Sequence, residues 1–391
     1  MLSSKNNLLI FILTVGVFSI INTEMGVIGI LPLLAERFGI TISHAGLLIS
    51  MFALAVAFSG PVMPLVFSGI NRKKVMLFVL GLFSLGNIIS IFTDNFTVAL
   101  LARVVPAIFH PVYCSLAFSV AGSSVPEQDR LKAVAKVIVG VSAGMVLGVP
   151  ISSFVASNFS LDAAMAVFAA GNILAFAATL LFVPSLPVEE RVSYKEQLGL
   201  LKRPVLILSI IGIIFMNGAV FGVFGFFSGY LESITKLSWN TISGVLLIYG
   251  AANIAGNIIG GHLLSKAPVR TAVLFPVVLA AVFTVFYFVG TSAAAVFAVT
   301  LLWGILGGIN VNINQYWITS AAPEAPDFAN GLFLTAANLG TTFGTVLCGE
   351  IIAAFGMEVM MFGGVIFLGL CFVFMCARVY AGRQMNPVPS V

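Results

Sequence analysis

Three residues that can bind or stabilise a proton stand inside long apolar stretches of this 391-residue sequence: Glu24, Arg103 and His110. Glu24 interrupts the segment FSIINTEMGVIGILP, and the other two share the segment LLARVVPAIFHPVY. A charged side chain at the centre of a membrane helix costs about 2.5–3.5 kcal/mol on insertion scales, so such residues tend to face the protein interior and serve a function. A carboxylate, a guanidinium and an imidazole together are suited to proton transfer.

These three residues have two possible roles. Burial disfavours the charged form of a carboxyl group and a nearby guanidinium favours it, so Glu24 beside Arg103 can change its protonation with its surroundings. His110 is a second proton carrier, because imidazole titrates in the physiological pH range. The alternative is a fixed structural ion pair of Glu24 and Arg103, with His110 a hydrogen-bonded core residue. Glu350, near the end of another apolar segment, is expected to reach the lipid headgroups.

The composition is that of a membrane protein. Hydrophobic residues make up 60% of the chain and charged residues 8%, against roughly 45–50% and about 25% in soluble domains. The four cysteines lie in apolar runs and are expected to be small hydrophobic side chains, not a disulfide or metal set. The first apolar run, about 24 residues, is too long for a signal-peptide core and is expected to be retained. Twelve runs can span a bilayer as helices, near 8–31, 44–67, 74–93, 97–121, 133–157, 163–183, 204–229, 240–264, 271–290, 294–319, 328–354 and 359–379.

The basic residues predict the orientation. With the N-terminus in the cytoplasm, every lysine and arginine except Arg37, Arg103 and Lys236 lies in a cytoplasmic segment. The net charge of +4 therefore reflects topology, and no nucleic-acid partner is expected. The polar stretch 184–203 is predicted to be a cytoplasmic linker between an N-terminal bundle (1–183) and a C-terminal bundle (204–391). The expected fold is an all-α membrane protein with twelve transmembrane helices in two pseudo-symmetric six-helix bundles and both termini inside.

Several motifs in order resemble the major facilitator superfamily, and the resemblance covers nearly the whole chain. Asn22-Thr23-Glu24, LLARVVPAIFHPVY and MVLGVP (145–150) are similar to motifs of helices 1, 4 and 5 in its drug:proton antiporter-1 group. That group includes bacterial sugar, arabinose and purine-nucleoside exporters and their chloramphenicol-resistance relatives. The resemblance implies repeated six-helix halves, solute export by alternating access and a central cavity lined in part by helices 1 and 4.

Helix 5 and the loop after helix 2 are the expected gating elements. Glycines recur every four residues in helix 5, so a neighbouring backbone can approach closely, and a proline can bend the helix. The gating candidates there are Gly144, Gly148 and Pro150, with plain helix packing as the alternative. By resemblance to the family's basic loop motif, Arg72 and Lys73 are further candidates.

The C-terminal half carries stripes of amides and aromatic rings on four expected helices. Bonding between helices explains each amide singly, whereas four such stripes indicate a polar cavity. Amides and rings suit a neutral, hydroxyl-rich or ring-bearing solute, because a cationic drug would favour a carboxylate. The expected substrate contacts are Asn22 of helix 1 and, in the C-terminal half, Asn217, Phe221, Phe224, Tyr249, Asn253, Asn257, Asn310, Asn314, Trp317 and Asn338.

The sequence favours a proton-coupled exporter of a small neutral polar or amphipathic solute, such as a sugar, a nucleoside or a phenicol-type drug. It contains no Walker A sequence, metal-ligand spacing or Ser/His/Asp arrangement, so ATP-driven pumping, a metal, another cofactor and enzymatic activity are not expected. An importer or facilitator on the same fold is the alternative, and a non-transporting receptor or scaffold is a remote one. The expected partners are the solute, protons and the bilayer of the bacterial inner membrane, in which we expect a monomer.

Overall fold

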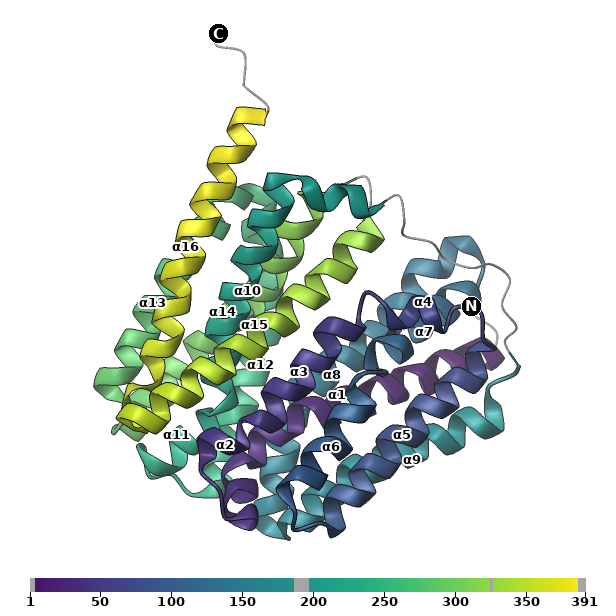
Figure 1. Cartoon of the computed structure of the whole chain (residues 1–391), viewed down its shortest axis with the longest axis horizontal. Coiled ribbons are helices and arrows are strands. Elements are labelled where there is room, and N and C mark those ends of the chain that lie inside the picture. The colour runs from purple at the N-terminus through teal and green to yellow at the C-terminus, as the bar shows by residue number, and fades with distance from the viewer. Residues whose placement is uncertain (1–3, 186–196, 324–325, 386–391) are drawn as a thin grey trace. The chain divides into compact units, whose positions relative to one another are not determined.

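The fold is built from membrane-spanning helices. The computed structural model describes residues 4–185, 197–323 and 326–385, and every regular element in these three ranges is a helix (Figure 1). Twelve helical segments in this part of the chain are long and apolar enough to cross a membrane. The all-α class and the twelve spans predicted from the sequence are therefore confirmed.

The first six spans begin at the N-terminus and end at Phe182. The first, third, fifth and sixth spans are each built on one long helix, whereas the second and fourth are divided. The elements are α1 (Ser4–Phe38), α2 (Ile42–Ala45), α3 (Leu47–Ser59), α4 (Met63–Val66), α5 (Arg72–Phe92), α6 (Phe96–Ala107), α7 (His110–Ser123), η1 (Glu127–Asp129), α8 (Arg130–Asn158) and α9 (Leu161–Phe182).

The last six spans follow a short 3-10 helix. Most of the linker predicted at 184–203 lies outside the described residues, and its last part forms this short helix. The elements are η2 (Gln197–Lys202), α10 (Pro204–Gly225), α11 (Phe227–Ser233), α12 (Trp239–Lys266), α13 (Pro268–Val289), α14 (Ala293–Thr319), α15 (Pro326–Phe355), η3 (Met357–Val359) and α16 (Met360–Met385).

The fourth span is interrupted beside His110, where we expected a continuous helix. Helix α6 ends at Ala107 and α7 begins at His110, with Pro106 and Pro111 on either side of the break. Proline has no backbone N–H to donate and its ring crowds the preceding turn, so two prolines five residues apart disfavour a regular helix between them. The break makes His110 the first residue of a new helix.

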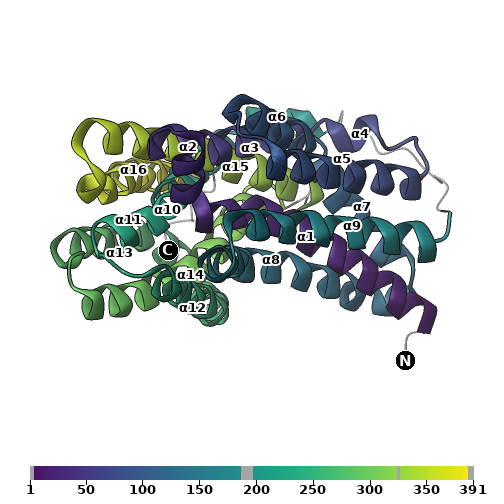
Figure 2. The same ribbon diagram turned by 90° about the horizontal axis from the view of Figure 1, so that it is seen from below.

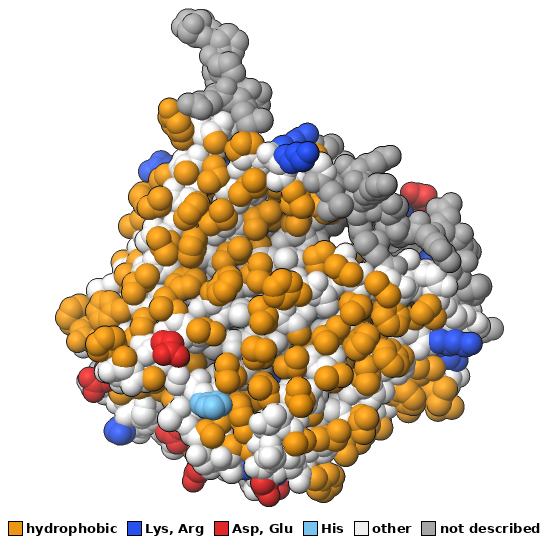
Figure 3. Space-filling view, in the orientation of Figure 1, with side chains coloured by type: hydrophobic (Ala, Val, Ile, Leu, Met, Phe, Trp, Pro, Cys, Tyr) orange, Lys and Arg blue, Asp and Glu red, His pale blue; other side chains and the backbone are white. Residues whose placement is uncertain are grey.

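The surface is apolar to a degree that only a lipid environment accommodates. Large side chains such as Phe92 and Phe288 are 81% and 75% exposed. In the view of Figure 3, hydrophobic side chains cover most of the visible face, and charged side chains are few. Contiguous apolar surface of this kind marks contact with another apolar phase, here the bilayer.

Residue contacts divide the chain into two compact units that differ from the two sequence halves. Two segments are exchanged: Ile42–Ala57, which is nearly all of the second span, and Trp239–Leu247, which is the start of α12. Side-chain bonds hold each in its unit: Ser243 Oγ donates to Ser153 Oγ at 2.8 Å, and Thr342 Oγ1 donates to the Ser50 carbonyl at 3.2 Å. Unit 1 comprises Met1–Thr41, Phe58–Val192 and Trp239–Leu247, and unit 2 comprises Ile42–Ala57, Ser193–Ser238 and Ile248–Val391.

In unit 1, α1 is the central helix. It packs along α8 and also contacts α5, α7 and α9, and the neighbouring α1, α8 and α9 can be followed in Figure 2. Its middle is accordingly buried: Val17, Ile20 and Leu31 have no exposed surface. A polar residue in this helix therefore faces protein on most sides.

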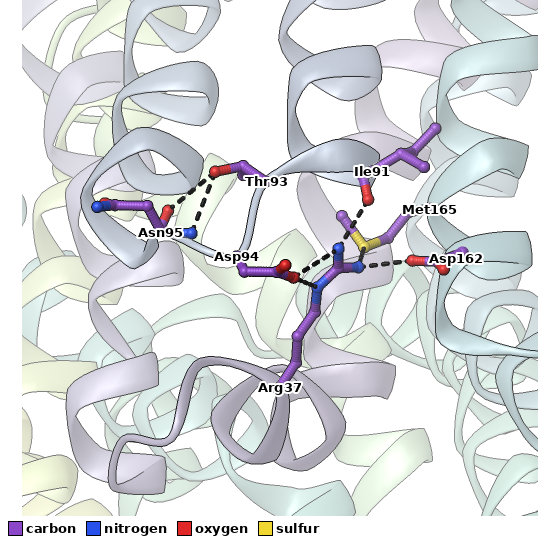
Figure 4. A network of polar contacts seen from close by, with 7 residues as sticks. All are labelled: Arg37, Ile91, Thr93, Asp94, Asn95, Asp162 and Met165. Atoms are coloured by element: carbon purple, nitrogen blue, oxygen red, sulfur yellow. Dashed lines mark hydrogen bonds and ion pairs between the residues drawn. The ribbon is translucent and has the colours of Figure 1, made fainter.

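Arg37, one of the basic residues outside the expected cytoplasmic segments, closes a polar network at the end of α1 (Figure 4). Its Nη1 donates to Asp162 Oδ1 at 2.6 Å, and its Nε donates to Asp94 Oδ1 at 3.2 Å. Its Nη2 donates to the Ile91 carbonyl at 2.7 Å. Arg37 therefore ties the end of α1 to the α5–α6 turn and to the first turn of α9, which explains why this cation stands outside the basic segments.

Candidate functional site

Glu24 lies in the middle of α1, and its carboxylate is directed at the start of α7. Its side chain is 13% exposed, and Oε2 lies 3.7 Å from His110 Nε2. Arg103, which is 7% exposed, is close enough to interact electrostatically with Glu24. The structure thus brings together the three residues that the sequence singled out.

Arg103 is anchored on the backbone of α1. Its Nη1 donates to the carbonyl of Thr23 at 3.1 Å, and its Nη2 donates to the carbonyl of Glu24 at 3.4 Å. These acceptors do not titrate. The tether between α6 and α1 therefore persists whether or not the Glu24 carboxyl group is ionised, in addition to the electrostatic attraction between the two side chains.

The imidazole of His110 has a second neighbour that sequence reasoning missed. Cys114 Sγ lies 3.5 Å from His110 Nε2, the same nitrogen that faces Glu24. We expected Cys114 to be a small hydrophobic side chain. The available signal was its position four residues after His110, which places both on one face of α7. Glu24 and Cys114 therefore both lie beside the same imidazole nitrogen, with the thiol within hydrogen-bond distance and the carboxylate 3.7 Å away.

A buried hydrogen-bond network centred on Thr23 stands next to Glu24. Thr23 Oγ1 accepts from Asn87 Nδ2 at 3.1 Å and from Asn172 Nδ2 at 2.9 Å, and it donates to the Ser19 carbonyl at 3.0 Å. The two asparagines belong to α5 and α9, and neither was among the sites expected from the sequence. The available signal in the sequence was that each asparagine places an amide side chain inside an apolar span. The network fixes α1 to two further helices at the level of the carboxylate.

Asn22, an expected substrate contact, faces α8. It is 3% exposed, and its Oδ1 has no hydrogen-bond partner among the described residues. A Cβ atom placed on Gly148 would lie 3.2 Å from that oxygen. Asn22 therefore lies at the closely packed α1–α8 contact.

The glycine stripe of α8 is the surface on which α1 packs. A Cβ atom at Gly140 would lie 2.5 Å from the Thr14 carbonyl oxygen, and one at Gly144 would lie 2.7 Å from Ile21 Cβ. Ser152 Oγ donates to the Gly26 carbonyl at 2.6 Å and extends the contact. Pro150 lies within α8, which continues through it to Asn158. The stripe therefore lets the backbones of α1 and α8 approach each other closely.

The basic residues expected in a loop form the first turn of α5, which contacts the end of α9. Lys73 Nζ donates to the Leu180 carbonyl at 2.9 Å, in the last turn of α9, where a cation complements the helix dipole. Asn71 caps α5 by accepting from the Lys74 backbone N–H. Arg72, the other gating candidate, is the half-buried first residue of α5.

In unit 2, the expected amide contacts differ in burial and in bonding. Asn217, Asn310 and Asn314 are buried, Asn253 and Asn338 are half-buried, and Asn257 is exposed. Asn314 Nδ2 donates to Asn310 Oδ1 at 3.1 Å, whereas Asn217 and Asn338 donate to carbonyls of their own helices. Asn217, Asn314 and Asn338 therefore each use a side-chain N–H group for a hydrogen bond inside the bundle.

Tyr249 and Asn253 of α12 place two polar groups above Gly307 of α14. A Cβ atom on Gly307 would lie 2.8 Å from Asn253 Nδ2 and 2.9 Å from the Tyr249 hydroxyl oxygen. The missing side chain therefore leaves room for both groups. In the described part of the chain, neither side chain forms a hydrogen bond, which leaves them available to a ligand.

Aromatic rings surround this position. Phe224 stacks on Tyr249 with ring centroids 4.5 Å apart, and Trp303 meets Tyr249 edge-on at 5.0 Å. Trp303, which belongs to the same stripe of α14 as Asn310, Asn314 and Trp317, is fully buried. Phe221 is half-buried on α10, one turn before Phe224, and Trp317 is buried in the last turn of α14.

No group of three or more His, Cys, Asp or Glu side chains that could hold a metal ion occurs in the described residues.

Comparisons with known proteins agree with this architecture. Residues 13–345 match the family model described as Major Facilitator Superfamily. The chain is 31% identical over 374 residues, 94% of each protein, to the uncharacterized MFS-type transporter YtbD of Bacillus subtilis (strain 168). It is 23% identical over 348 residues to a probable sugar efflux transporter of Mannheimia succiniciproducens, covering 89% of this chain and 88% of that one.

Among solved structures, the fold is similar to that of a bacterial homologue of the human lysosomal transporter Spinster, in an inward-facing and unoccupied conformation. The TM-score is 0.84 and the sequence identity 14%, with both chains fully covered. The chain belongs to the major facilitator superfamily. It is a membrane transporter of a small solute and not an enzyme.

The glycine stripe gives a test that separates packing from gating. We expect Gly144→Ala to lower the melting temperature of the purified protein, because overpacking typically costs about 1–3 kcal/mol. The matched control is Gly261→Ala in α12, where an added Cβ meets no atom within 4 Å, so its stability should be unchanged or slightly raised. A Gly144→Ala protein as stable as the wild type but defective in transport would instead favour gating.

Proposed function

We propose that the protein is a proton-coupled exporter of a small neutral polar solute. The observation that carries the proposal is the Glu24 carboxylate 3.7 Å from the His110 imidazole in the middle of a membrane bundle. Two groups that can both titrate, placed together and shielded from water, suit a transporter that must bind and release a proton. If the protein did not bind and release protons, apolar side chains at positions 24 and 110 would make the two helices easier to insert into the membrane.

Each residue of the cluster has a separate proposed role. Glu24 carries the coupling proton, and His110 exchanges it with Glu24 or carries it in its place. Arg103 stabilises the ionised carboxylate by its charge while its hydrogen bonds to Thr23 and Glu24 carbonyls hold α6 against α1. When Glu24 is protonated, its electrostatic attraction to Arg103 is lost. The populations of the inward-open and outward-open states then shift, and this shift couples proton binding to alternating access.

The proposed solute is a sugar or a nucleoside-like compound. Its support is the pair of polar groups on Tyr249 and Asn253, which face Gly307 beside the stacked ring of Phe224. Hydroxyl and amide groups bind neutral hydroxyl-rich molecules without a charge. The likeness to a protein named as a probable sugar efflux transporter points to the same class.

We further propose that the protein acts as a monomer in the bacterial inner membrane with both termini in the cytoplasm. The support for the orientation is the asymmetric distribution of lysine and arginine described above, and the monomer is kept as the expectation from the sequence. Labelling of a cysteine placed at Lys195 by an impermeant reagent added outside intact cells would contradict this orientation.

The solute class can be found by thermal-shift screening of the purified protein against pentoses, nucleosides and phenicols. For the compound that raises the melting temperature, Tyr249→Phe and Asn253→Ala should each weaken binding by about 1–3 kcal/mol, roughly 5- to 150-fold, because a polar partner is left unpaired. Asn158→Ala, at an exposed position of unit 1, is the control and should bind normally. Unchanged affinity in both test variants would place the solute elsewhere.

Proton coupling can be measured with that compound in proteoliposomes. Glu24→Gln keeps the shape of the side chain but cannot titrate, so proton flux on adding the solute should disappear, while downhill solute exchange continues. Glu350→Gln, the same substitution at an exposed position of α15, should retain normal flux. Normal coupled flux in Glu24→Gln would assign Glu24 a structural role and transfer proton coupling to His110.

A further inference from the structure

Unit 2 contains a buried cation that the transport proposal does not use. Arg378, in the second half of α16, is 8% exposed. Its Nε donates to Ser209 Oγ at 3.2 Å, and its Nη2 donates to the Trp317 carbonyl at 3.2 Å and to Ser320 Oγ at 2.8 Å. Its guanidinium carbon also lies 3.9 Å from the centre of the Trp317 ring. The side chain is thus held rigidly between α10, α14 and α16.

The hydrogen bonding of this guanidinium is incomplete. An arginine side chain has five N–H donors, and the three bonds described above leave both N–H groups of Nη1 without an acceptor in the described part of the chain. Nη1 is not fully enclosed by the protein and retains some accessible surface. A donor pair on a fixed guanidinium, open on one side, has the geometry to receive two oxygen atoms.

The charge of Arg378 is likewise unbalanced. All of its hydrogen-bond acceptors are neutral, and no carboxylate forms an ion pair with it in the described residues. Lys202 and Arg203, immediately before α10, add positive charge at the same end of unit 2. A buried charge without a partner is costly, so an anion bound at this position would be stabilised.

We propose that Arg378 binds the phosphate group of an anionic molecule at the end of unit 2 where α10 begins and α16 ends. Two phosphate oxygens accept from Nη1, and the ring of Trp317 holds the guanidinium plane in place. A lipid headgroup and a free phosphate compound share this chemistry. The site lies at the end of membrane spans, which is the depth of lipid headgroups, and basic pockets between helices bind anionic headgroups.

The experiment measures the melting temperature of the full-length protein with two probes. The first probe is inorganic phosphate, compared with chloride at equal ionic strength. The second is phosphatidylglycerol in nanodiscs, compared with phosphatidylcholine. A ligand at about ten times its dissociation constant stabilises the folded state enough to raise the melting temperature of a chain of this length by about 2 °C. A rise with both probes indicates a site open to free phosphate, and a rise with phosphatidylglycerol alone indicates a lipid site.

Arg378→Gln should abolish the rise, whereas Arg270→Gln, an exposed arginine of α13 at the same end of unit 2, should retain it. An equal rise in Arg378→Gln and the wild type would overturn the proposal, because the anion would then bind elsewhere. If Arg378→Gln does not fold, Arg378→Lys takes its place, because lysine keeps the charge but lacks the paired donors, and the rise should be reduced in that variant. No rise with either probe would show that Arg378 binds no phosphate.

Discussion

The structure depends on accommodating one carboxylate in the middle of an apolar helix. Glu24 has little contact with solvent, and the groups around it are an imidazole nitrogen at 3.7 Å and a guanidinium anchored on the neighbouring backbone. In an apolar bundle, such a carboxylate is tolerated only with partners of this kind. The position and orientation of α1, α6 and α7 all serve to bring these partners together.

Helix α1 is held at this level by two different kinds of contact. On one side, the glycine stripe of α8 brings the two backbones together, as Gly140 and Gly144 show. On other sides, Asn87 and Asn172 donate to Thr23, the residue before Glu24. A hydrogen-bonded network of this type fixes geometry more strictly than apolar packing does. The carboxylate therefore approaches His110 from a helix that has little freedom to rotate.

Hydropathy and the rare intramembrane charges were sufficient to predict much of this molecule. Twelve spans follow from apolar runs of the required length, because a bilayer admits little else. The grouping of Glu24, Arg103 and His110 followed from their rarity inside apolar spans and from the family motifs of helices 1 and 4.

Features that depend on how helices pack were not predictable from the sequence. The break before His110 depends on how two prolines are accommodated between α6 and α7. Arg37 and Asp162 are far apart in the chain and become partners only when α1 and α9 are packed. Arg378 looked like one more basic residue near a terminus, and only its burial between three helices sets it apart.

The central claim is that Glu24 gains and loses a proton during transport. Infrared difference spectroscopy tests it directly, because a protonated carboxylic acid has a carbonyl-stretching band that a carboxylate lacks. Adding the solute at constant pH should produce such a band change in the wild type and in Glu350→Gln, and none in Glu24→Gln. The same band change in Glu24→Gln would contradict the claim, since the titrating group would then be another residue.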